Sequence, residues 1–85
     1  MNEPELFLVT VFFGDANFNV DMELPSQQPI GELSRRVLDI LKSLYEGELS
    51  GWQSCRLQYN NRILSSDETL LKAGAFDGSK IFMIE

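Results

Sequence analysis

The first third of the chain contains two segments whose apolar residues predict antiparallel strands, one almost continuously apolar and one alternating. Residues 5–13 are rich in β-branched and aromatic side chains, which favour strands. Residues 18–24 alternate apolar and polar side chains without a break, which is the period of a strand with one buried face. Between them, Gly14-Asp15-Ala16-Asn17 is a run of turn-forming residues, so a β-hairpin is expected here.

A helix is predicted after this hairpin. Pro25-Ser26-Gln27-Gln28-Pro29 interrupts the alternation, and apolar residues then recur at spacings of three and four, as on one face of a helix. The predicted helix spans residues 30–45, and Gly47 stands where a residue with positive φ commonly ends a helix. Six of its side chains are expected to face the core, namely Ile30, Leu33, Val37, Ile40, Leu41 and Leu44.

A loop and a second hairpin are predicted next. Residues 47–54 form the loop, which contains Trp52. Strands over residues 55–59 and 62–64 flank Asn60-Asn61, and asparagine tolerates the positive φ that a tight turn requires.

The chain is expected to close with a crossover and a last strand. Residues 65–76 form the crossover, in which Thr69-Leu70-Leu71 can make one helical turn, and Asp77-Gly78 turns the chain into a strand over residues 80–84. The resulting order, ββαββ(turn)β, predicts an α+β fold in which a five-stranded mixed sheet packs on one helix, the β-grasp. Its first and last strands are apolar at nearly every position, as expected of central, parallel neighbours.

Composition bounds the number of domains and the classes of function. At 85 residues, 44% of them hydrophobic, the chain has room for a single domain over residues 1–85. A net charge of -6 without a basic cluster argues against nucleic-acid binding. Histidine is absent and Cys55 is the only cysteine, which excludes Ser-His and Cys-His nucleophile pairs and the usual zinc ligand sets. We therefore expect no metal, no cofactor and no enzymatic activity.

No segment predicts membrane insertion or export. The longest apolar run, residues 6–13, is far shorter than the roughly 20 residues that cross a bilayer. The chain opens with Met1-Asn2-Glu3-Pro4-Glu5, which is acidic where a signal peptide is basic. Because no even set of cysteines suggests an oxidising compartment, a cytoplasmic location is expected.

Several of these segments resemble ubiquitin. The run from Arg56 to Leu64, then Thr69-Leu70 and then residues 81–84 align with the second half of ubiquitin without a gap. Residues 24–37 similarly resemble the approach to ubiquitin's helix. The resemblance implies the ubiquitin-like form of the β-grasp.

Two departures from ubiquitin indicate a particular branch. The chain is longer than ubiquitin between Val37 and Arg56, and it stops at Glu85 without a terminal glycine pair, so conjugation is not expected. Four segments resemble the YukD/EsaB group, which consists of small bacterial ubiquitin-like proteins associated with type VII secretion. They are Pro29-Ile30-x-x-Leu33, Val37-Leu38-Asp39-x-Leu41, Trp52 and Ala73-Gly74-Ala75-x-Asp77-Gly78.

This resemblance implies a function in protein binding. The chain would be a non-conjugated ubiquitin-like interaction module, an accessory or regulatory component of a bacterial type VII secretion system, with a secretion component as its protein partner. The alternative is a ubiquitin-like modifier or adaptor of a eukaryotic ubiquitin-type pathway. Genes for a secretion ATPase and its substrates beside this one would favour the first hypothesis.

Few residues suggest chemistry beyond binding. Glu3 with Glu5, or Asp67 with Glu68, could act as paired carboxylates, but acids on loops are usually solvated and no other titrating group is placed beside them. Cys55 begins a strand next to apolar positions, so a buried structural thiol is expected in preference to a redox site.

The candidate site is the sheet face turned away from the helix. In the first strand, positions 7, 9 and 11 are assigned to the core, and in the last strand the ubiquitin-like register assigns 81 and 83 to it. Exposed apolar patches usually mark a contact site, whereas a register shift of one residue would bury these side chains. The predicted protein-binding residues are Leu8, Phe12, Arg56, Gln58, Arg62, Phe82 and Ile84.

Two residues qualify this prediction. Gln58 occupies the position of the central isoleucine on ubiquitin's partner-binding face, so ordinary ubiquitin receptors are expected to bind poorly. Trp52 is either a lid over the open end of the core or an anchor in an interface.

Overall fold

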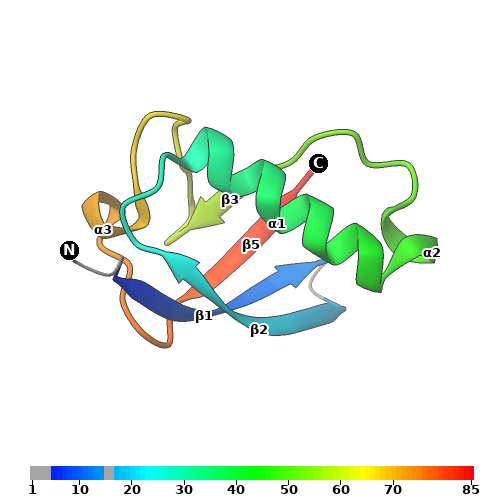
Figure 1. Cartoon of the computed structure of the whole chain (residues 1–85), viewed down its shortest axis with the longest axis horizontal. Coiled ribbons are helices and arrows are strands. Elements are labelled where there is room, and N and C mark those ends of the chain that lie inside the picture. Colours follow the sequence, from blue (N-terminus) through cyan, green and yellow to red (C-terminus); the bar gives the residue numbers. More distant parts are fainter. Residues whose placement is uncertain (1–4, 15–16) are drawn as a thin grey trace.

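The computed structural model describes residues 5–14 and 17–85, and in it one helix lies across one face of a five-stranded sheet (Figure 1). The strand order is β2-β1-β5-β3-β4, with β1 and β5 parallel and every other pair antiparallel. The strands are β1 (Leu6–Phe13), β2 (Phe18–Pro25), β3 (Arg56–Tyr59), β4 (Arg62–Ile63) and β5 (Lys80–Ile84). The predicted β-grasp, with the first and last strands central and parallel, is confirmed.

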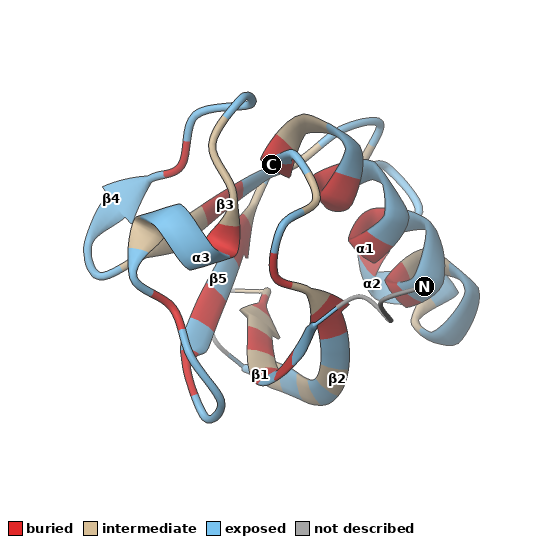
Figure 2. Ribbon diagram, turned by 60° about the vertical axis from the view of Figure 1, so that its left-hand side comes forward, coloured by how far each residue is buried: buried red, intermediate tan, exposed pale blue. Residues whose placement is uncertain are grey.

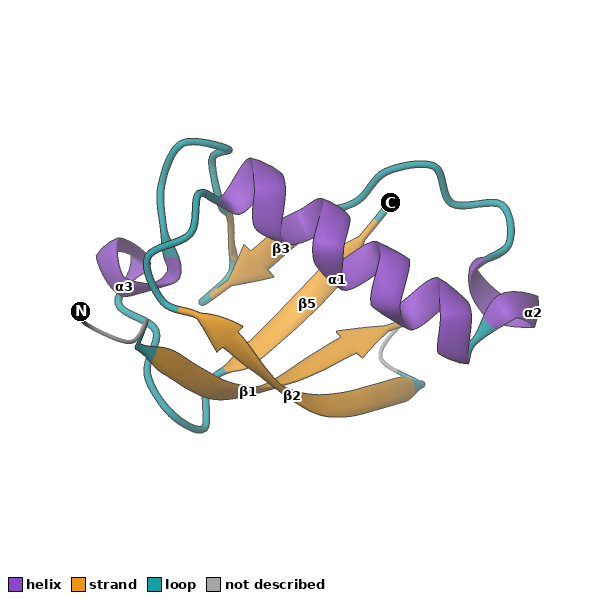
Figure 3. Cartoon of the chain, in the orientation of Figure 1, coloured by secondary structure: helices purple, strands orange, loops and turns teal. Residues whose placement is uncertain are grey.

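Three helices accompany the sheet (Figure 3). They are α1 (Ile30–Leu44), α2 (Glu46–Leu49) and α3 (Leu70–Ala73). Among the residues described, none of them has the length and apolar character that crossing a bilayer requires. Asp15 and Ala16 of the predicted first turn lie outside the described residues.

The alternation in β1 sorts its side chains between the two faces of the sheet as predicted. Phe7, Val9 and Val11 are buried against α1, whereas Leu6 and Leu8 are 45% and 49% exposed. The buried hydrophobic residues form one core cluster. Figure 2 shows that buried residues occur both on α1 and on the strands of the sheet. The register of β1 therefore corresponds to the prediction, and the shifted alternative is excluded.

The helix buries a different stripe from the one predicted. Ile30, Leu33, Val37 and Leu41 are buried as expected, but Ile40 and Leu44 are 44% and 63% exposed, so their assignment to the core was wrong.

Leu38 is buried instead, because the segment between α2 and β3 lies along its side of the helix. The Cys55 thiol donates a hydrogen bond to the Ser34 carbonyl, and the Lys42 ammonium donates one to the Trp52 carbonyl. Ser34, Leu38 and Lys42 are spaced four residues apart, so they share one flank of α1, and the loop covers it.

The end of α1 also differs from the prediction. Gly47 does not cap the helix with a positive φ. The C-cap of α1 is Tyr45, with φ of -131°, and Gly47 belongs to α2. The Tyr45 ring packs against Phe13 and Phe18, with centroid distances of 5.1 and 5.7 Å. Aromatic packing, together with the burial of Leu49 in α2, thus redirects the chain where a glycine cap was expected.

The crossover before β5 is tied to the start of α1. The first helical N–H groups have no partner within a helix, and here the N–H groups of Ile30 and Gly31 donate to the carbonyls of Glu68 and Ser66 at 2.9 Å each. A Cβ on Gly31 would lie 3.1 Å from the Ser66 Cβ, so this close approach favours glycine. The predicted helical turn in the crossover is α3, whose N-cap Thr69 accepts a hydrogen bond from the backbone of Lys72.

The second hairpin turns at the predicted pair. Asn60 and Asn61 have φ values of 55° and 64°, and the strands that they join pair Gln58 with Ile63 and Tyr59 with Arg62. Because directly paired residues of a sheet project to the same side, this register decides which residues of β4 share a face with Gln58.

Candidate functional site

The face of the sheet opposite α1, which we call the outward face, carries a cluster of apolar side chains. Its central pair is Phe12 on β1 and Phe82 on β5, which are direct partners in the parallel register. Their rings stack with centroids 5.0 Å apart and an interplanar angle of 20°. Phe82 is 38% exposed, and Phe12 is half-buried.

The row continues across the sheet beyond this pair. Gln58 on β3 is the partner of Phe82, and Ile63 on β4, 41% exposed, is the partner of Gln58. Ile84 lies two residues further along β5 on the same side and is paired with Arg56. Leu8 extends the apolar surface along β1. The structure thus brings six of the seven predicted binding residues to one face.

Arg62 is the exception, because it pairs with Tyr59 and therefore projects to the other side of the sheet. Its guanidinium forms a bidentate ion pair with the Glu68 carboxylate, with Nη1 to Oε1 at 2.8 Å and Nη2 to Oε2 at 3.2 Å. The expectation that Arg62 flanks the outward face is not met. Ile63 holds that place, and a two-residue turn at Asn60-Asn61 was the signal in the sequence that could have identified it.

Charge on this face changes from acidic on β2 to basic on β3. Exposed Asp21 and Glu23 lie on β2, the edge strand, and Asp21 accepts a hydrogen bond from the Thr10 hydroxyl at 2.6 Å. Arg56 on β3 supplies the basic side, and Lys80 adds a positive charge near the start of the central strand β5. An apolar centre with opposite charges on its two flanks gives a docking partner a defined orientation.

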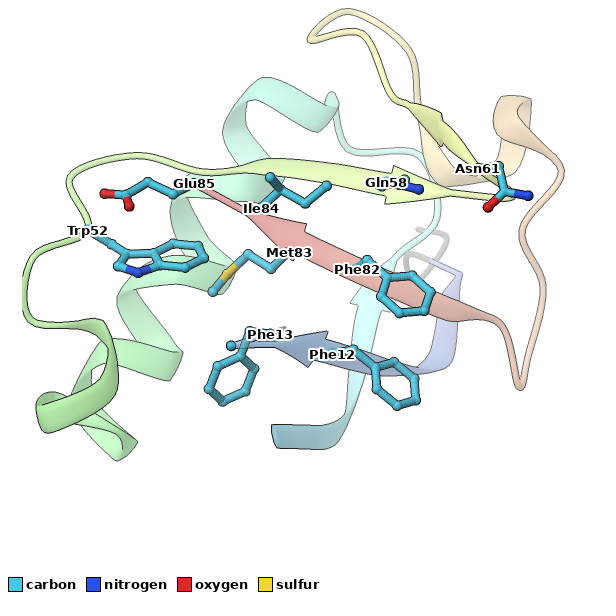
Figure 4. A pocket seen from close by; sticks show the side chains of 10 residues that line it. Phe12, Phe13, Trp52, Gln58, Asn61, Phe82, Met83, Ile84 and Glu85 are labelled. Atoms are coloured by element: carbon cyan, nitrogen blue, oxygen red, sulfur yellow. The ribbon is translucent and has the colours of Figure 1, made fainter. Parts of the chain in front are cut away.

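A hollow of about 580 Å³ opens beside the outward face where β1 and β5 end (Figure 4). It is lined by Phe12, Phe13, Gly14, Trp52, Gln58, Asn61, Phe82, Met83, Ile84 and Glu85. Trp52 is half-buried and packs against the core while its ring also forms part of this wall. The lid and the anchor roles considered for Trp52 are therefore compatible.

The groups considered for chemistry are dispersed and engaged elsewhere. Glu5 accepts a hydrogen bond from the Ser26 hydroxyl at 3.0 Å, while Glu3 lies outside the described residues. Hydrogen bonds from Arg62 and from the Ser65 backbone hold the pKa of Glu68 below its ordinary value. Asp67 is exposed beside it.

The Cys55 thiol is also an unsuitable nucleophile. Burial raises its pKa from the ordinary value of 9.0 to about 11, and its Sγ donates to the Ser34 carbonyl at 3.3 Å. The thiol is therefore protonated at neutral pH, as expected of a structural cysteine, since the thiolate is the reactive form.

No protein-family model and no curated protein sequence matches this chain. Solved structures do match. The ubiquitin-like domain of the Mycobacterium tuberculosis type VII secretion system protein ECCD1 superposes with a TM-score of 0.77 at 21% identity, covering 95% of this chain and 99% of that chain. The EccD5 ubiquitin-like domain from Mycobacterium xenopi gives a TM-score of 0.76 at 15% identity, over 94% and 93%. Caldiarchaeum subterraneum ubiquitin gives 0.64 at 20% identity, over 94% and 92%.

These matches extend over nearly the whole chain. At such low identities they define the fold and leave the function open. The chain has the ubiquitin-like β-grasp fold.

Proposed function

We propose that this chain is a protein-interaction module of a bacterial type VII secretion system, an accessory or regulatory component of the YukD/EsaB kind. It would bind a protein component of that system noncovalently through the outward face. The similarity to two ubiquitin-like domains of type VII secretion proteins supports the setting. The stacked Phe12–Phe82 pair on the outward face, in which Phe82 is exposed, is the observation that supports the mode of action.

The physical case for binding at this face rests on where the energy of an interface resides. Aromatic anchors near the centre of a contact contribute most of the binding free energy, and charges at the rim mainly adjust rate and orientation. Here Phe82 and Phe12 occupy the centre of an apolar row, and Arg56 and Lys80 lie beside it. This arrangement suits recognition of a partner with an apolar patch and offers no reacting group.

The experiment is a calorimetric titration of the purified chain with the cytosolic portions of the host's type VII secretion proteins, which measures the binding free energy. We expect Phe82→Ala to weaken binding by about 2 kcal/mol and Arg62→Ala by less than about 1 kcal/mol. Arg62 is the matched control because it is exposed but projects away from the outward face.

Each variant is checked for folding by circular dichroism before titration. Native affinity in folded Phe82→Ala and Phe12→Ala proteins would place the binding site elsewhere. Tight binding to eukaryotic ubiquitin receptors, with none to the secretion proteins, would support the modifier or adaptor alternative.

A further inference from the structure

The free edge of β2 is a second candidate binding surface, because the backbone on this side has no neighbouring strand in the described residues. β2 is the outermost strand of the sheet, eight residues long, and no strand among residues 5–14 and 17–85 pairs with its other side. Alternate backbone N–H and C=O groups of such a strand point away from the sheet and can accept an added strand. The backbone of β2 thus offers a template over its length.

The inward side of this edge is apolar and incompletely covered. Val20 and Met22 are only half-buried, whereas their partners on β1, Val11 and Val9, are 0% and 1% exposed. The core therefore ends at β2 with apolar surface still open to solvent.

The uncovered flank of α1 lies on this same side of the molecule. Ile40 and Leu44 are spaced by one helical turn and lie on the flank opposite Lys42, which faces the loop that leads to β3. At the end of α1, the Tyr45 ring contacts Phe18, the first residue of β2. The exposed apolar residues at the end of α1 and the half-buried apolar residues of β2 therefore lie on the same side of the molecule.

The opposite side of the edge is acidic. Asp21 and Glu23 are exposed on the outward side of β2, and neither forms an ion pair within the described part of the chain. Side chains directly opposite each other on neighbouring strands lie about 4.5–5.5 Å apart, so oppositely charged pairs stabilise an added strand. A strand beside β2 would gain most from basic residues on this side.

The same acids disfavour a second copy of this chain as the occupant. Two β2 edges paired antiparallel would bring Asp21 and Glu23 of one copy opposite the same acids of the other. Like charges that face each other across strands are destabilising, and the whole chain carries a net charge of -6. The edge is therefore suited to a basic strand.

We propose that the free edge of β2 binds an extended segment of a partner protein in which apolar and basic residues alternate. The segment adds to the sheet as a strand next to β2. Its apolar side chains pack on Val20, Met22, Ile40 and Leu44, and its basic side chains pair with Asp21 and Glu23. This site is separate from the apolar centre of the outward face and does not depend on the secretion-system assignment.

The test uses a capped, fluorescein-labelled peptide of eight alternating valine and lysine residues, titrated into the whole chain by fluorescence anisotropy. A valine–glutamate peptide of the same length is the control for charge. A valine–lysine peptide with a proline at its centre is the control for backbone pairing, because proline has no N–H to donate to β2. We expect the valine–lysine peptide to bind at least about tenfold more tightly than either control. Amide exchange followed by NMR should show new protection among residues 18–24, since Pro25 has no amide proton.

Two substitutions test the contacts. Leu44→Glu places a charge among the exposed apolar residues of α1 and should weaken binding by about tenfold, whereas Leu71→Glu, at a residue 45% exposed on α3, is the matched control and should not. Glu23→Lys should reduce the preference for the basic peptide over the acidic one. Equal affinity for both peptides, no binding to either, or protection confined to β3 and β5 would overturn the proposal. Protection of residues 18–24 that rises with protein concentration in the absence of peptide would instead identify a second copy as the occupant.

Discussion

The two faces of the sheet carry similar apolar side chains but differ in how far those side chains are buried. On β5, Ile81 is 0% exposed under α1, and the next residue, Phe82, is 38% exposed on the outward face. On β1, Val11 and Phe12 make the same contrast. Side-chain direction in the strand, not hydrophobicity, therefore decides whether an apolar residue stabilises the core or remains available for a partner.

The difference follows from coverage. One long helix and the loop around Trp52 cover the inner face, while no element among the described residues crosses the outward face. The outward apolar cluster contributes less to folding, because much of its surface stays in water, and so it can be varied with less loss of stability. Paired substitutions on the two faces test this comparison directly.

The largest effect is expected for neighbouring residues of β5. Ile81→Ala should lower the free energy of unfolding by about 2–5 kcal/mol, because it leaves a cavity between the sheet and α1. Phe82→Ala should cost about 1 kcal/mol, mostly from the lost stacking on Phe12. Urea denaturation of the two variants measures both values, and equal losses would contradict the distinction between the faces.

The rate at which a thiol reagent modifies Cys55 tests how well the inner face of the sheet is covered. Because burial raises the thiol pKa to about 11, its modification at neutral pH should be slower than in the urea-unfolded chain, by up to about a hundredfold. The contribution of this group to stability is fully present below pH 9 and is lost as pH rises through about 11, since the unfolded chain then ionises more readily. Equal modification rates in the folded and unfolded chains would show that the thiol is accessible.

The helix offers a matched pair of its own. Val37→Ala should lower the free energy of unfolding by about 1–3 kcal/mol, because Val37 is fully buried. Ile40→Ala, at a residue 44% exposed, should cost less than about 1 kcal/mol. Thermal or urea unfolding of both variants makes the comparison, and a larger loss for Ile40→Ala would mean that the helix is rotated relative to the sheet.

The smallest effect concerns the Arg62–Glu68 ion pair, which lies near the surface. The pKa of Glu68 is lowered by the Arg62 hydrogen bond, so its contribution to stability is present above the ordinary carboxyl pKa and is lost as pH falls through the lowered value. Glu68→Gln should flatten the acid side of the stability–pH profile and change the melting temperature near neutral pH only slightly. A steep loss of stability at neutral pH would indicate that the bonds of Glu68 to the crossover matter more than its charge.

The strands could be predicted well because their signals are local. Positions 7, 9 and 11 form the uninterrupted apolar parity of β1, which assigned Val9 and Val11 to the core and Leu8 and Phe12 to the outward face, and the structure agrees. Asn60-Asn61 likewise fixed the position of the second hairpin, since few residue types accept two consecutive positive φ angles. A two-residue turn at Asn60-Asn61 pairs Tyr59 with Arg62 and Gln58 with Ile63. The sequence therefore already contained the signal that Ile63, and not Arg62, lies on the outward face.

The helix needed the tertiary structure. Spacings of three and four predict that α1 has an apolar face. They do not predict on which side of that face the neighbouring segments bury further apolar residues. The loop that carries Trp52 packs along the Leu38 side, which leaves Ile40 and Leu44 exposed on the opposite flank of the helix. In the same way, the requirement for glycine at position 31 arises from the approach of Ser66, more than thirty residues later in the chain. Local periodicity thus decided the elements and their faces, whereas long-range packing decided which apolar residues remained free to bind.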